Sequence, residues 1–131
     1  MPPLDEIRVA AAVIERDGLI LIGQRKRGSR HSLKWEFPGG KVEAGESPRE
    51  ALQRELREEL AIDAVIGEEL DNYRFQYPGG PVTHLFFYHV KKFSGEPQNL
   101  DFEHIVWERR GLLPTYDFLE GDVAFVRKLA G

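Results

Sequence analysis

Short apolar runs separated by polar turns cover most of this chain, and one segment repeats its apolar positions at helical spacing. Residues 7–15 and 19–22 are both apolar, and the Asp17-Gly18 pair between them favours a tight turn. These two runs are therefore predicted to form a β-hairpin. The basic segment 26–34 that follows is predicted to be a loop.

A helix is predicted from residue 47 to about residue 60. Ser47 can cap its first turn, Pro48 suits the first helical position, and Glu50 completes a Ser-x-x-Glu capping box. Just before this helix, the segment 35–40 ends in Pro-Gly-Gly, which is predicted to break any regular element and to let the backbone approach a ligand. The stripe of the helix that should face the core consists of Leu52, Leu56 and Leu60.

The second half of the chain predicts further strands and a closing helix. Apolar residues recur at helical spacing between 118 and 129 and indicate that last helix. Strands around one strong helix, with a second helix at the end, predict a single α/β domain over residues 1–131, built as a sandwich on a mixed sheet. The predicted extended segments are 62–66, 72–77, 82–92 and 105–108, with a Pro-Gly-Gly-Pro turn at 78–81.

Composition narrows the class of protein. The chain has 131 residues, of which 41% are apolar and 31% charged, as in an ordinary globular domain with a sizeable core. It has no cysteine, which excludes a disulfide framework and a thiolate metal site. No apolar run approaches the roughly 20 residues of a membrane-spanning helix, and segment 1–6 lacks the pattern of a signal peptide. A cytoplasmic protein with no membrane partner is therefore expected.

The net charge of -4 bears on the partner. A nucleic-acid polymer would favour a basic surface, so such a polymer is not expected to bind. A small anionic ligand remains compatible with this charge if divalent cations bridge it to acidic side chains. The chain is expected to act on such a small molecule as a monomer or a homodimer.

Three acids cluster on the first predicted helix. Glu55, Glu58 and Glu59 fall within one sector of roughly 100°. Like charges at this spacing destabilise a helix by about 0.2–0.5 kcal/mol per pair, and hard divalent cations such as Mg²⁺ would reverse the sign. The alternative is a solvated charged face with weak surface ion pairs. The basic partners of such a face would be Arg49, Arg54 and Arg57.

A longer pattern encloses this cluster. Gly40 is followed after five residues by Glu46, and after seven more by the run 54–62, Arg-Glu-Leu-Arg-Glu-Glu-Leu-Ala-Ile. The pattern is similar to the signature of the Nudix hydrolase family, in which a glycine usually stands where this chain has Ala61. The resemblance implies an α/β/α sandwich with a mixed sheet and the signature helix packed on it. It also implies a metal-dependent hydrolase that cuts nucleoside diphosphates linked to another group.

The resemblance carries roles onto matching residues. It implies that Glu58 and Glu59 hold Mg²⁺, which Mn²⁺ can replace, with the backbone carbonyl of Gly39 as a further ligand. Glu55 would position or deprotonate the attacking water. Arg54 would orient the carboxylates through charge-assisted hydrogen bonds, and Glu46 would assist near the metals. A further acid from the loop before the last strand often completes such a site. The two candidates are Asp101 and Glu103, of which Glu103 is favoured.

Segments outside the signature resemble the MutT-like branch of the family. That resemblance implies hydrolysis of a nucleoside triphosphate, such as oxidised dGTP (8-oxo-dGTP) or a CTP-type nucleotide, to a monophosphate and pyrophosphate. Alternatives are a nucleotide sugar, a dinucleoside polyphosphate or a dinucleotide cofactor as substrate. A non-catalytic binding module is less expected, because such modules usually lose signature acids and this chain keeps them. The matching segments are 34–43, 73–75, 85–88 and 95–97.

Three further residues are candidates for contacts with the nucleotide, each with an alternative. Arg25 stands where the branch has a substrate-contacting arginine, or is a solvated loop residue. Phe37 can stack on a base or belong to the core. Asp122 stands where a related enzyme has a base-reading asparagine, or caps the last helix. In the strand 82–92, one face should pack in the core and the other should line a pocket, and the sequence leaves open which.

Overall fold

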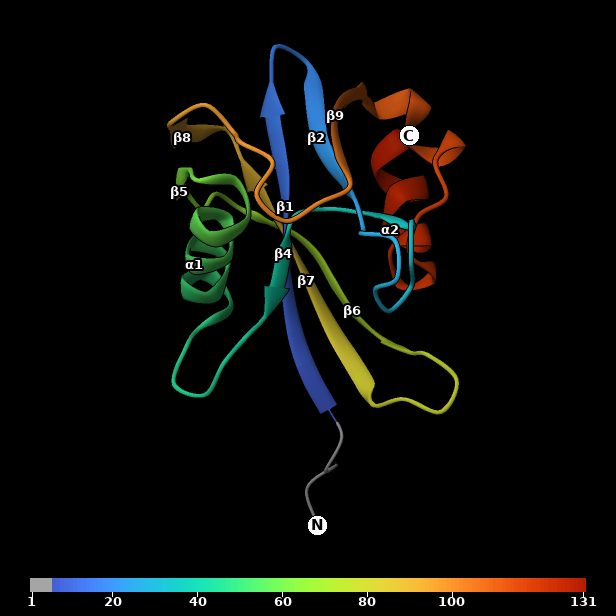
Figure 1. Ribbon diagram of the computed structural model, residues 1–131. Helices are drawn as coiled ribbons and strands as arrows, with labels where there is room; N and C mark the ends of the chain where they lie inside the picture. The colour runs from blue at the N-terminus through green and yellow to red at the C-terminus, as the bar shows by residue number, and fades with distance from the viewer. Residues whose placement is uncertain (1–5) are drawn as a thin grey trace.

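The computed structural model describes residues 6–131 (Figure 1). Residues 1–5, on which most of the expectation about a signal peptide rests, lie outside the described part. The strands are β1 (Glu6–Arg16), β2 (Leu19–Gln24), β3 (Trp35–Glu36), β4 (Gly39–Lys41), β5 (Asp63–Val65), β6 (Glu69–Gln76), β7 (Val82–Val90), β8 (Lys92–Ser94) and β9 (His104–Arg109). The helices are α1 (Pro48–Leu60), the short 3-10 helix η1 (Arg110–Thr115) and α2 (Glu120–Ala130).

Strand β1 organises the main sheet. One edge of β1 runs parallel to β7, from Glu6 opposite Val82 to Ile14 opposite Val90. The other edge is divided, because β4 pairs antiparallel with residues 9–11 and β2 pairs antiparallel with residues 15–16. Strand β6 extends the sheet beyond β7, and β3 and β9 pair with β2. The predicted mixed sheet is confirmed, with parallel pairing between β1 and β7 and antiparallel pairing elsewhere.

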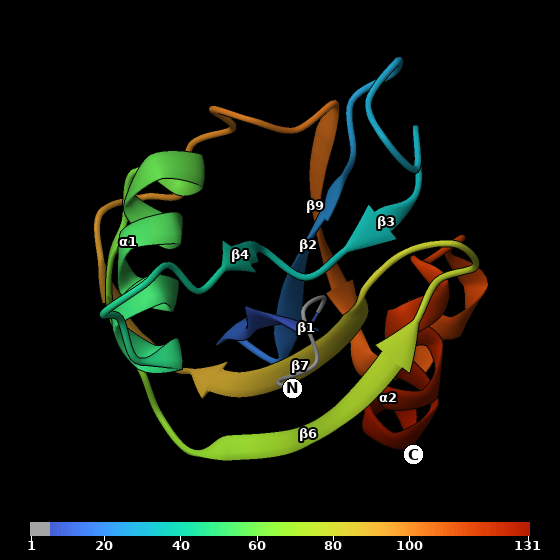
Figure 2. The same ribbon diagram turned by 90° about the horizontal axis from the view of Figure 1, so that it is seen from below.

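The two long helices lie on opposite sides of the sheet, as Figures 1 and 2 show. Because successive strand residues face opposite ways, Ala10 and Ala12 of β1 pack toward α1, whereas Ala11 and Val13 pack toward α2. The predicted stripe of Leu52, Leu56 and Leu60 on α1 is fully buried in the core between α1 and the sheet. The α/β/α arrangement is therefore as expected.

Helix α1 begins and ends as its sequence predicts. The Ser47 hydroxyl accepts a hydrogen bond from the Glu50 amide at 3.1 Å, and the Ser47 amide donates to the Glu50 carboxylate at 2.9 Å. At the other end Ala61 adopts the left-handed conformation with φ 57°. Its amide donates to the carbonyl of Arg57, so the turn of a glycine C-cap forms although alanine fits it less well.

Two predictions about elements were wrong, and one short helix was missed. The segment 82–92 is not one strand: β7 ends at Val90, and β8 leaves the main sheet to pair with β5. The Pro-Gly-Gly segment does not exclude regular structure, because β3 and β4 flank Phe37-Pro38 and β4 finds a partner in β1. Helix η1 was not expected. These pairings depend on partners distant in the chain, which local pattern does not supply. Across residues 6–131, no helix is both long and apolar enough to cross a membrane.

Candidate active site

Two glycines allow β4 to lie directly against α1. A Cβ atom on Gly39, whose φ is 152°, would lie 2.0 Å from the carbonyl oxygen of Ala10. A Cβ atom on Gly40 would lie 2.5 Å from the carboxylate carbon of Glu55. The Gly39 amide donates to the Glu59 carboxylate at 2.9 Å. The Gly-Gly pair therefore brings the β4 backbone to the acidic face of α1, where the sequence placed a ligand site.

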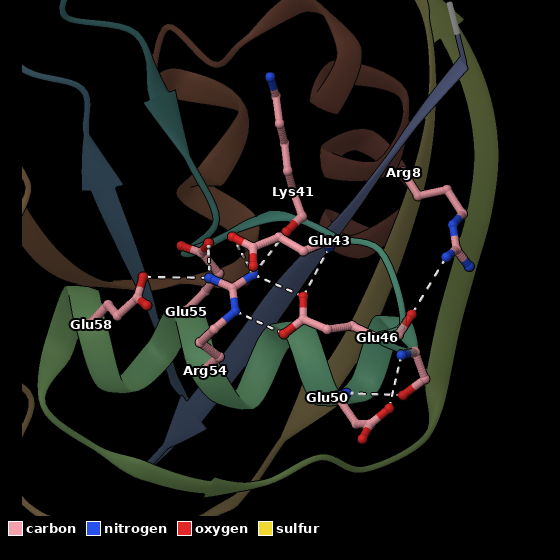
Figure 3. Close-up of polar contacts among 9 residues, drawn as sticks. Arg8, Lys41, Glu43, Glu46, Glu50, Arg54, Glu55 and Glu58 are labelled. Carbon is pink, nitrogen blue, oxygen red and sulfur yellow. Dashed lines mark hydrogen bonds and ion pairs between the residues drawn. The ribbon is translucent and has the colours of Figure 1, made fainter. Parts of the chain in front are cut away.

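Arg54 holds the acidic cluster together (Figure 3). Its guanidinium binds both oxygens of Glu46, with Nε donating at 2.8 Å and Nη2 at 3.0 Å. Its Nη1 donates to Glu55 at 2.8 Å and to Glu58 at 3.5 Å, and its Nη2 also donates to the carbonyl of Lys41 at 3.0 Å. Such a planar fork fixes several carboxylates at once. The structure thus places Arg54 where it contacts the acids, as the resemblance implied.

The acids differ in their electrostatic environment. Hydrogen bonds from Arg54 and from the Glu43 amide lower the pKa of Glu46 to about 2. Burial raises the pKa of Glu55, although Arg54 opposes that shift. Burial, followed by the negative charges of Glu36 and Glu55, raises the pKa of Glu59 to about 9. Glu59 is only 8% exposed, so its charged form is unstable without a cation nearby.

The donor chemistry of this region fits a hard divalent cation. Glu55, Glu58, Glu59 and the Gly39 backbone present only oxygen ligands on one side, the set that Mg²⁺ favours. The mutual repulsion of Glu55 and Glu59 is what such a cation would relieve. Within the part of the chain that the structure describes, however, no three acidic or histidine side chains lie close enough to form a ready-made metal site. Glu58 in particular remains exposed and turned to Arg54.

A pocket of about 270 Å³ opens beside this cluster on the α2 side of the sheet. Glu59, Gly39 and Gly40 form the part of its wall that it shares with the acidic cluster. Thr83 and Leu85 also line it, which answers the open question about the strand β7: its odd-numbered face looks toward the pocket and α2. The other polar or aromatic residues of the wall are Arg25, His31, Glu36, Lys41, Tyr77, Asp101 and Asp122.

Asp122 lies in the pocket wall and does not cap α2. The N-cap residue of α2 is Leu119, which makes no side-chain capping hydrogen bond, and Asp122 lies inside the helix. Asp122 is only 6% exposed. Burial, together with the negative charge of Glu36, raises its pKa to about 8. The capping alternative is therefore wrong, and near neutral pH the side chain is largely a protonated acid that can both donate and accept a hydrogen bond.

Arg25 and Glu36 form an ion pair in the same wall. The Arg25 Nη1 lies 3.2 Å from a Glu36 oxygen, and the Arg25 Nε donates to the carbonyl of Arg30 at 2.7 Å. Arg25 is thus held in the pocket and is not a freely solvated loop residue. Burial raises the pKa of Glu36 to about 7, although Arg25 opposes that shift.

Phe37 belongs to the aromatic core under α2 and lines the pocket from there. Its side chain is 3% exposed, and its ring centroid lies 5.2 Å from that of Phe118 and 5.6 Å from that of Phe125. Core packing therefore accounts for most of its surface. Only the small part of the Phe37 side chain that this packing leaves uncovered lines the pocket.

The two candidates for the extra acid are separated by the structure. Asp101 lines the pocket, and its negative charge is among the causes that raise the pKa of Glu59 and Glu36. Glu103 instead accepts a hydrogen bond from the Arg27 amide at 3.3 Å and does not line the pocket. The geometry favours Asp101, contrary to the preference drawn from the sequence. The spacing before β9 could not decide this, because the two acids lie in one irregular loop.

Sequence reasoning missed Glu36 and Tyr77 as pocket residues. Glu36 stands between Trp35 and Phe37, and an acid inside an aromatic segment is a signal that could have singled it out. Tyr77 follows β6 at the start of a turn and carries no local signal for a pocket. Its place becomes evident only when the β6–β7 turn is folded over the start of α2.

Comparison with known proteins gives the family. The profile of the NUDIX domain matches residues 5–128. The chain belongs to the Nudix family. The CTP pyrophosphohydrolase of Escherichia coli K12 is 48% identical over 101 residues, covering 77% of this chain and 74% of that protein. The 8-oxo-dGTP diphosphatase of Haemophilus influenzae is 36% identical over 124 residues, covering 94% of this chain and 90% of that protein.

Solved structures agree with the fold. The solution structure of the E. coli ORF135 protein superposes with a TM-score of 0.86 at 39% identity, covering 97% of this chain and 90% of the other. A MutT Nudix hydrolase from Burkholderia pseudomallei superposes with a TM-score of 0.84 at 28% identity, covering 96% and 98%. This Nudix hydrolase is therefore MutT-like. Nudix hydrolases generally need a divalent metal ion, in keeping with the oxygen-rich face described above.

Proposed function

We propose that this Nudix hydrolase converts a nucleoside triphosphate to a monophosphate and pyrophosphate with Mg²⁺ as its metal ion, which Mn²⁺ can replace. The observation that carries the proposal is the shared wall of Gly39, Gly40 and Glu59. It joins a pocket large enough for a nucleoside to the acidic face of α1. A base bound in the pocket would send its phosphates toward the acids.

The residues of the acidic face divide the work. Glu58, Glu59 and the Gly39 carbonyl would hold the metal, and Asp101, which lines the adjoining pocket, would be the further acid. When bound, a divalent ion neutralises the phosphates and lowers the pKa of a bound water. Glu55 would accept the proton of the attacking water, whose oxygen forms a bond to phosphorus as the bond to the pyrophosphate oxygen breaks.

Arg54 and Glu46 would act by orientation. The two-pronged pairing of Arg54 with Glu46 fixes the guanidinium, and the remaining Arg54 donors then fix Glu55 and the β4 backbone. Positioning of this kind removes much of the entropic part of the barrier. Neither residue needs to touch the nucleotide in this scheme.

Asp122 and Glu36 would read the base. A carboxylic acid that keeps its proton offers a donor next to an acceptor, so it matches a base edge that has an acceptor next to a donor. Oxidised guanine presents such an edge through its O6 and the hydrogen on N7. Cytosine presents one through N3 and its amino group. Arg25 and Phe37 would complete the pocket, Arg25 through its pairing with Glu36.

Two base classes are therefore carried forward. Oxidised dGTP is supported by relatives named 8-oxo-dGTP diphosphatase that span nearly the whole chain. A CTP-type nucleotide is supported by the 48% identity to a CTP pyrophosphohydrolase and by the complementarity of a carboxyl group to the cytosine amino group.

The size of the pocket and the intact acids argue against the remaining alternatives. A volume of about 270 Å³ lies at the small end of ligand pockets and suits one nucleoside better than two. A nucleotide sugar or a dinucleotide would need room for its second half. A non-catalytic binding module would have no need for the mutually repelling Glu55 and Glu59, of which Glu59 is buried.

The decisive experiment is a nucleotide panel with Mg²⁺, assayed separately for pyrophosphate and orthophosphate. The panel contains oxidised dGTP, dGTP, dCTP, CTP, a nucleotide sugar and a dinucleoside polyphosphate. We expect pyrophosphate from the triphosphates, with oxidised dGTP or a cytidine nucleotide preferred, and loss of turnover in excess EDTA. Preferential cleavage of the sugar or dinucleotide substrates, or full turnover in EDTA, would overturn the proposal.

A further inference from the structure

Two tyrosine hydroxyls hold a single peptide segment at the start of α2. Tyr73 lies on β6 and Tyr77 directly follows that strand. The Tyr73 hydroxyl donates to the carbonyl of Gly121 at 2.5 Å, and the Gly121 amide donates to the Tyr77 hydroxyl at 3.0 Å. Gly121, the residue next to Asp122, is thus held through both its backbone amide and its backbone carbonyl. We call these two contacts the tyrosine clamp.

The clamp takes the place of a local helix cap. The first amides of a helix have no partner within the helix and are commonly satisfied by a side chain at the N-cap. The apolar side chain of Leu119, the N-cap residue of α2, cannot accept such a hydrogen bond. Tyr77 supplies the acceptor from a different strand instead. The orientation of the first turn of α2 therefore depends on β6.

Glycine at position 121 is what lets the strand and the helix approach so closely. A Cβ atom there would lie 2.9 Å from the Tyr77 hydroxyl oxygen, 3.3 Å from the ring of Phe75 and 3.4 Å from Leu85. A larger residue would push the first turn of α2 away from β6. Because Asp122 is the next residue, that movement would displace its carboxyl group in the pocket wall.

We propose that Tyr73 and Tyr77 are positioning residues that fix the carboxyl group of Asp122 and so set which base the enzyme prefers. The inference rests on the proposed function, because it presumes that Asp122 reads the base. Tyr77 also lines the pocket, where its ring lies 4.7 Å from that of His31, whereas Tyr73 packs on Phe87. The shared action of the two tyrosines is therefore through their hydroxyl groups, not their rings.

Tyr→Phe variants remove the hydroxyls and keep the rings. Tyr73→Phe, Tyr77→Phe and the double variant are assayed for kcat/KM with oxidised dGTP, dGTP and dCTP, alongside melting curves. The matched control is Tyr116→Phe, because the Tyr116 hydroxyl also makes a hydrogen bond, of 2.6 Å to Glu108, but Tyr116 does not line the pocket. We expect the ratio of kcat/KM between two bases to change by about three- to tenfold in the clamp variants. The control should keep the wild-type ratio.

The same substitutions in an Asp122→Ala background separate positioning from a general structural role. If the clamp acts through Asp122, loss of the two tyrosine hydroxyls should no longer change the ratio of kcat/KM between two bases once the Asp122 side chain is gone. A double clamp variant with a lowered melting temperature and an unaltered ratio would overturn the inference. A shift in the ratio that persists without Asp122 would do so as well.

A measurement without substrate keeps the inference separate from the proposed function. The carboxyl ¹³C titration of Asp122, followed by NMR in the unliganded protein, should shift in Tyr73→Phe and Tyr77→Phe and stay unchanged in Tyr116→Phe. If the wild-type enzyme hydrolyses none of the nucleotides, the proposed function fails. The titration then still decides whether the clamp positions Asp122, and equal titrations in all variants would exclude it.

Discussion

The two ends of the candidate active site are built in different ways. The acidic end comes almost entirely from one stretch, residues 39–59, in which a helix and the turn before it carry the acids and Arg54. The base pocket draws its polar residues from the β2–β3 loop, β3, the β6–β7 turn, the loop before β9 and the start of α2. On the proposed function, the catalytic residues are thus encoded in a short stretch of sequence, whereas base choice depends on the fold of the whole domain.

Their charges are also balanced differently. In the acidic end, Arg54 neutralises part of the charge and lowers the pKa of Glu46, and a cation is needed for the rest. In the pocket, Arg25 is the only side chain paired with Glu36 among the described ion pairs, and Asp122 has no cationic partner among them. Burial therefore raises the pKa of both pocket acids, to about 7 for Glu36 and to about 8 for Asp122, so that Asp122 mostly holds its proton near neutral pH. One region is suited to metal and phosphate, the other to hydrogen bonds with a base.

The largest expected effect comes from a substitution in the acidic end of the site, which should change the rate but not the choice of nucleotide. Glu55→Gln keeps the shape of the side chain but removes the base that would accept the proton of water, so kcat should fall by about 10²–10⁴. The ranking of nucleotides should stay the same, because the pocket is untouched. The control is Glu68→Gln, an exposed acid outside both regions. A Glu55→Gln enzyme within about threefold of wild type would assign the base role to another acid.

A smaller loss is expected at the residue that orients the acids. Arg54→Lys keeps a positive charge but cannot reproduce the fork that binds Glu46 and Glu55 together. Activity or metal affinity should fall by about 10–100-fold, as for other residues that orient metal ligands. Titration of kcat against Mg²⁺ measures both. Arg57→Lys is the control on the same helix, since Arg57 makes only an exposed pair with Asp63. Equal losses in both variants would contradict a specific role for Arg54.

In the pocket, the buried Asp122 should make the free energy of unfolding depend on pH. The pKa of Asp122 is about 8 in the folded protein against an ordinary value of 3.8. The folded state therefore keeps a proton that the unfolded state releases, and stability is lost as the pH rises through this interval. Asn cannot ionise, so the stability of Asp122→Asn relative to wild type should change little near pH 4 and then rise by up to about 1.4 kcal/mol per pH unit towards pH 8.

Denaturant unfolding at several pH values measures this gain. Asp117→Asn provides the control, because Asp117 is exposed and pairs with Lys34 at the surface. It should show no gain that grows with pH. The idea of a protonated, buried Asp122 would fail if Asp122→Asn followed wild type at every pH.

The smallest expected effect lies outside both regions. Ala61 ends α1 with φ 57°, a conformation that glycine adopts without the steric cost paid by alanine. Ala61→Gly should therefore stabilise the protein by about 1 kcal/mol and leave kcat and the nucleotide ranking unchanged. Ala44→Gly, in the exposed loop before α1 and without a positive φ, should give no such gain. A lower melting temperature for Ala61→Gly would show that the departure from the family signature is not strained.

Much of the local structure could be predicted, for identifiable reasons. The hairpin of β1 and β2 and the start and end of α1 were predicted correctly because turn and capping chemistry act within a few residues. The segment 82–92 was divided wrongly because the partner of β8 is β5, far along the chain. The sequence left open whether Asp122 caps the last helix or lines a pocket. In the structure Leu119 is the N-cap residue and Asp122 is buried in the pocket wall, a burial that depends on segments far away in the chain.

The sequence alone determined the family, the helix α1 and the set of acids that one helical face must present. These follow from spacing, since residues three or four apart on a helix are neighbours whatever the rest of the chain does. The tertiary structure decided the direction of the β7 faces, the place of Asp101 in the pocket wall and the burial of Asp122. Those outcomes depend on contacts between segments far apart in the chain, such as the hydrogen bond between Tyr73 and Gly121, which are 48 positions apart. Local pattern carries no information about which distant segments meet, because their meeting is set by the packing of the whole sheet between two helices.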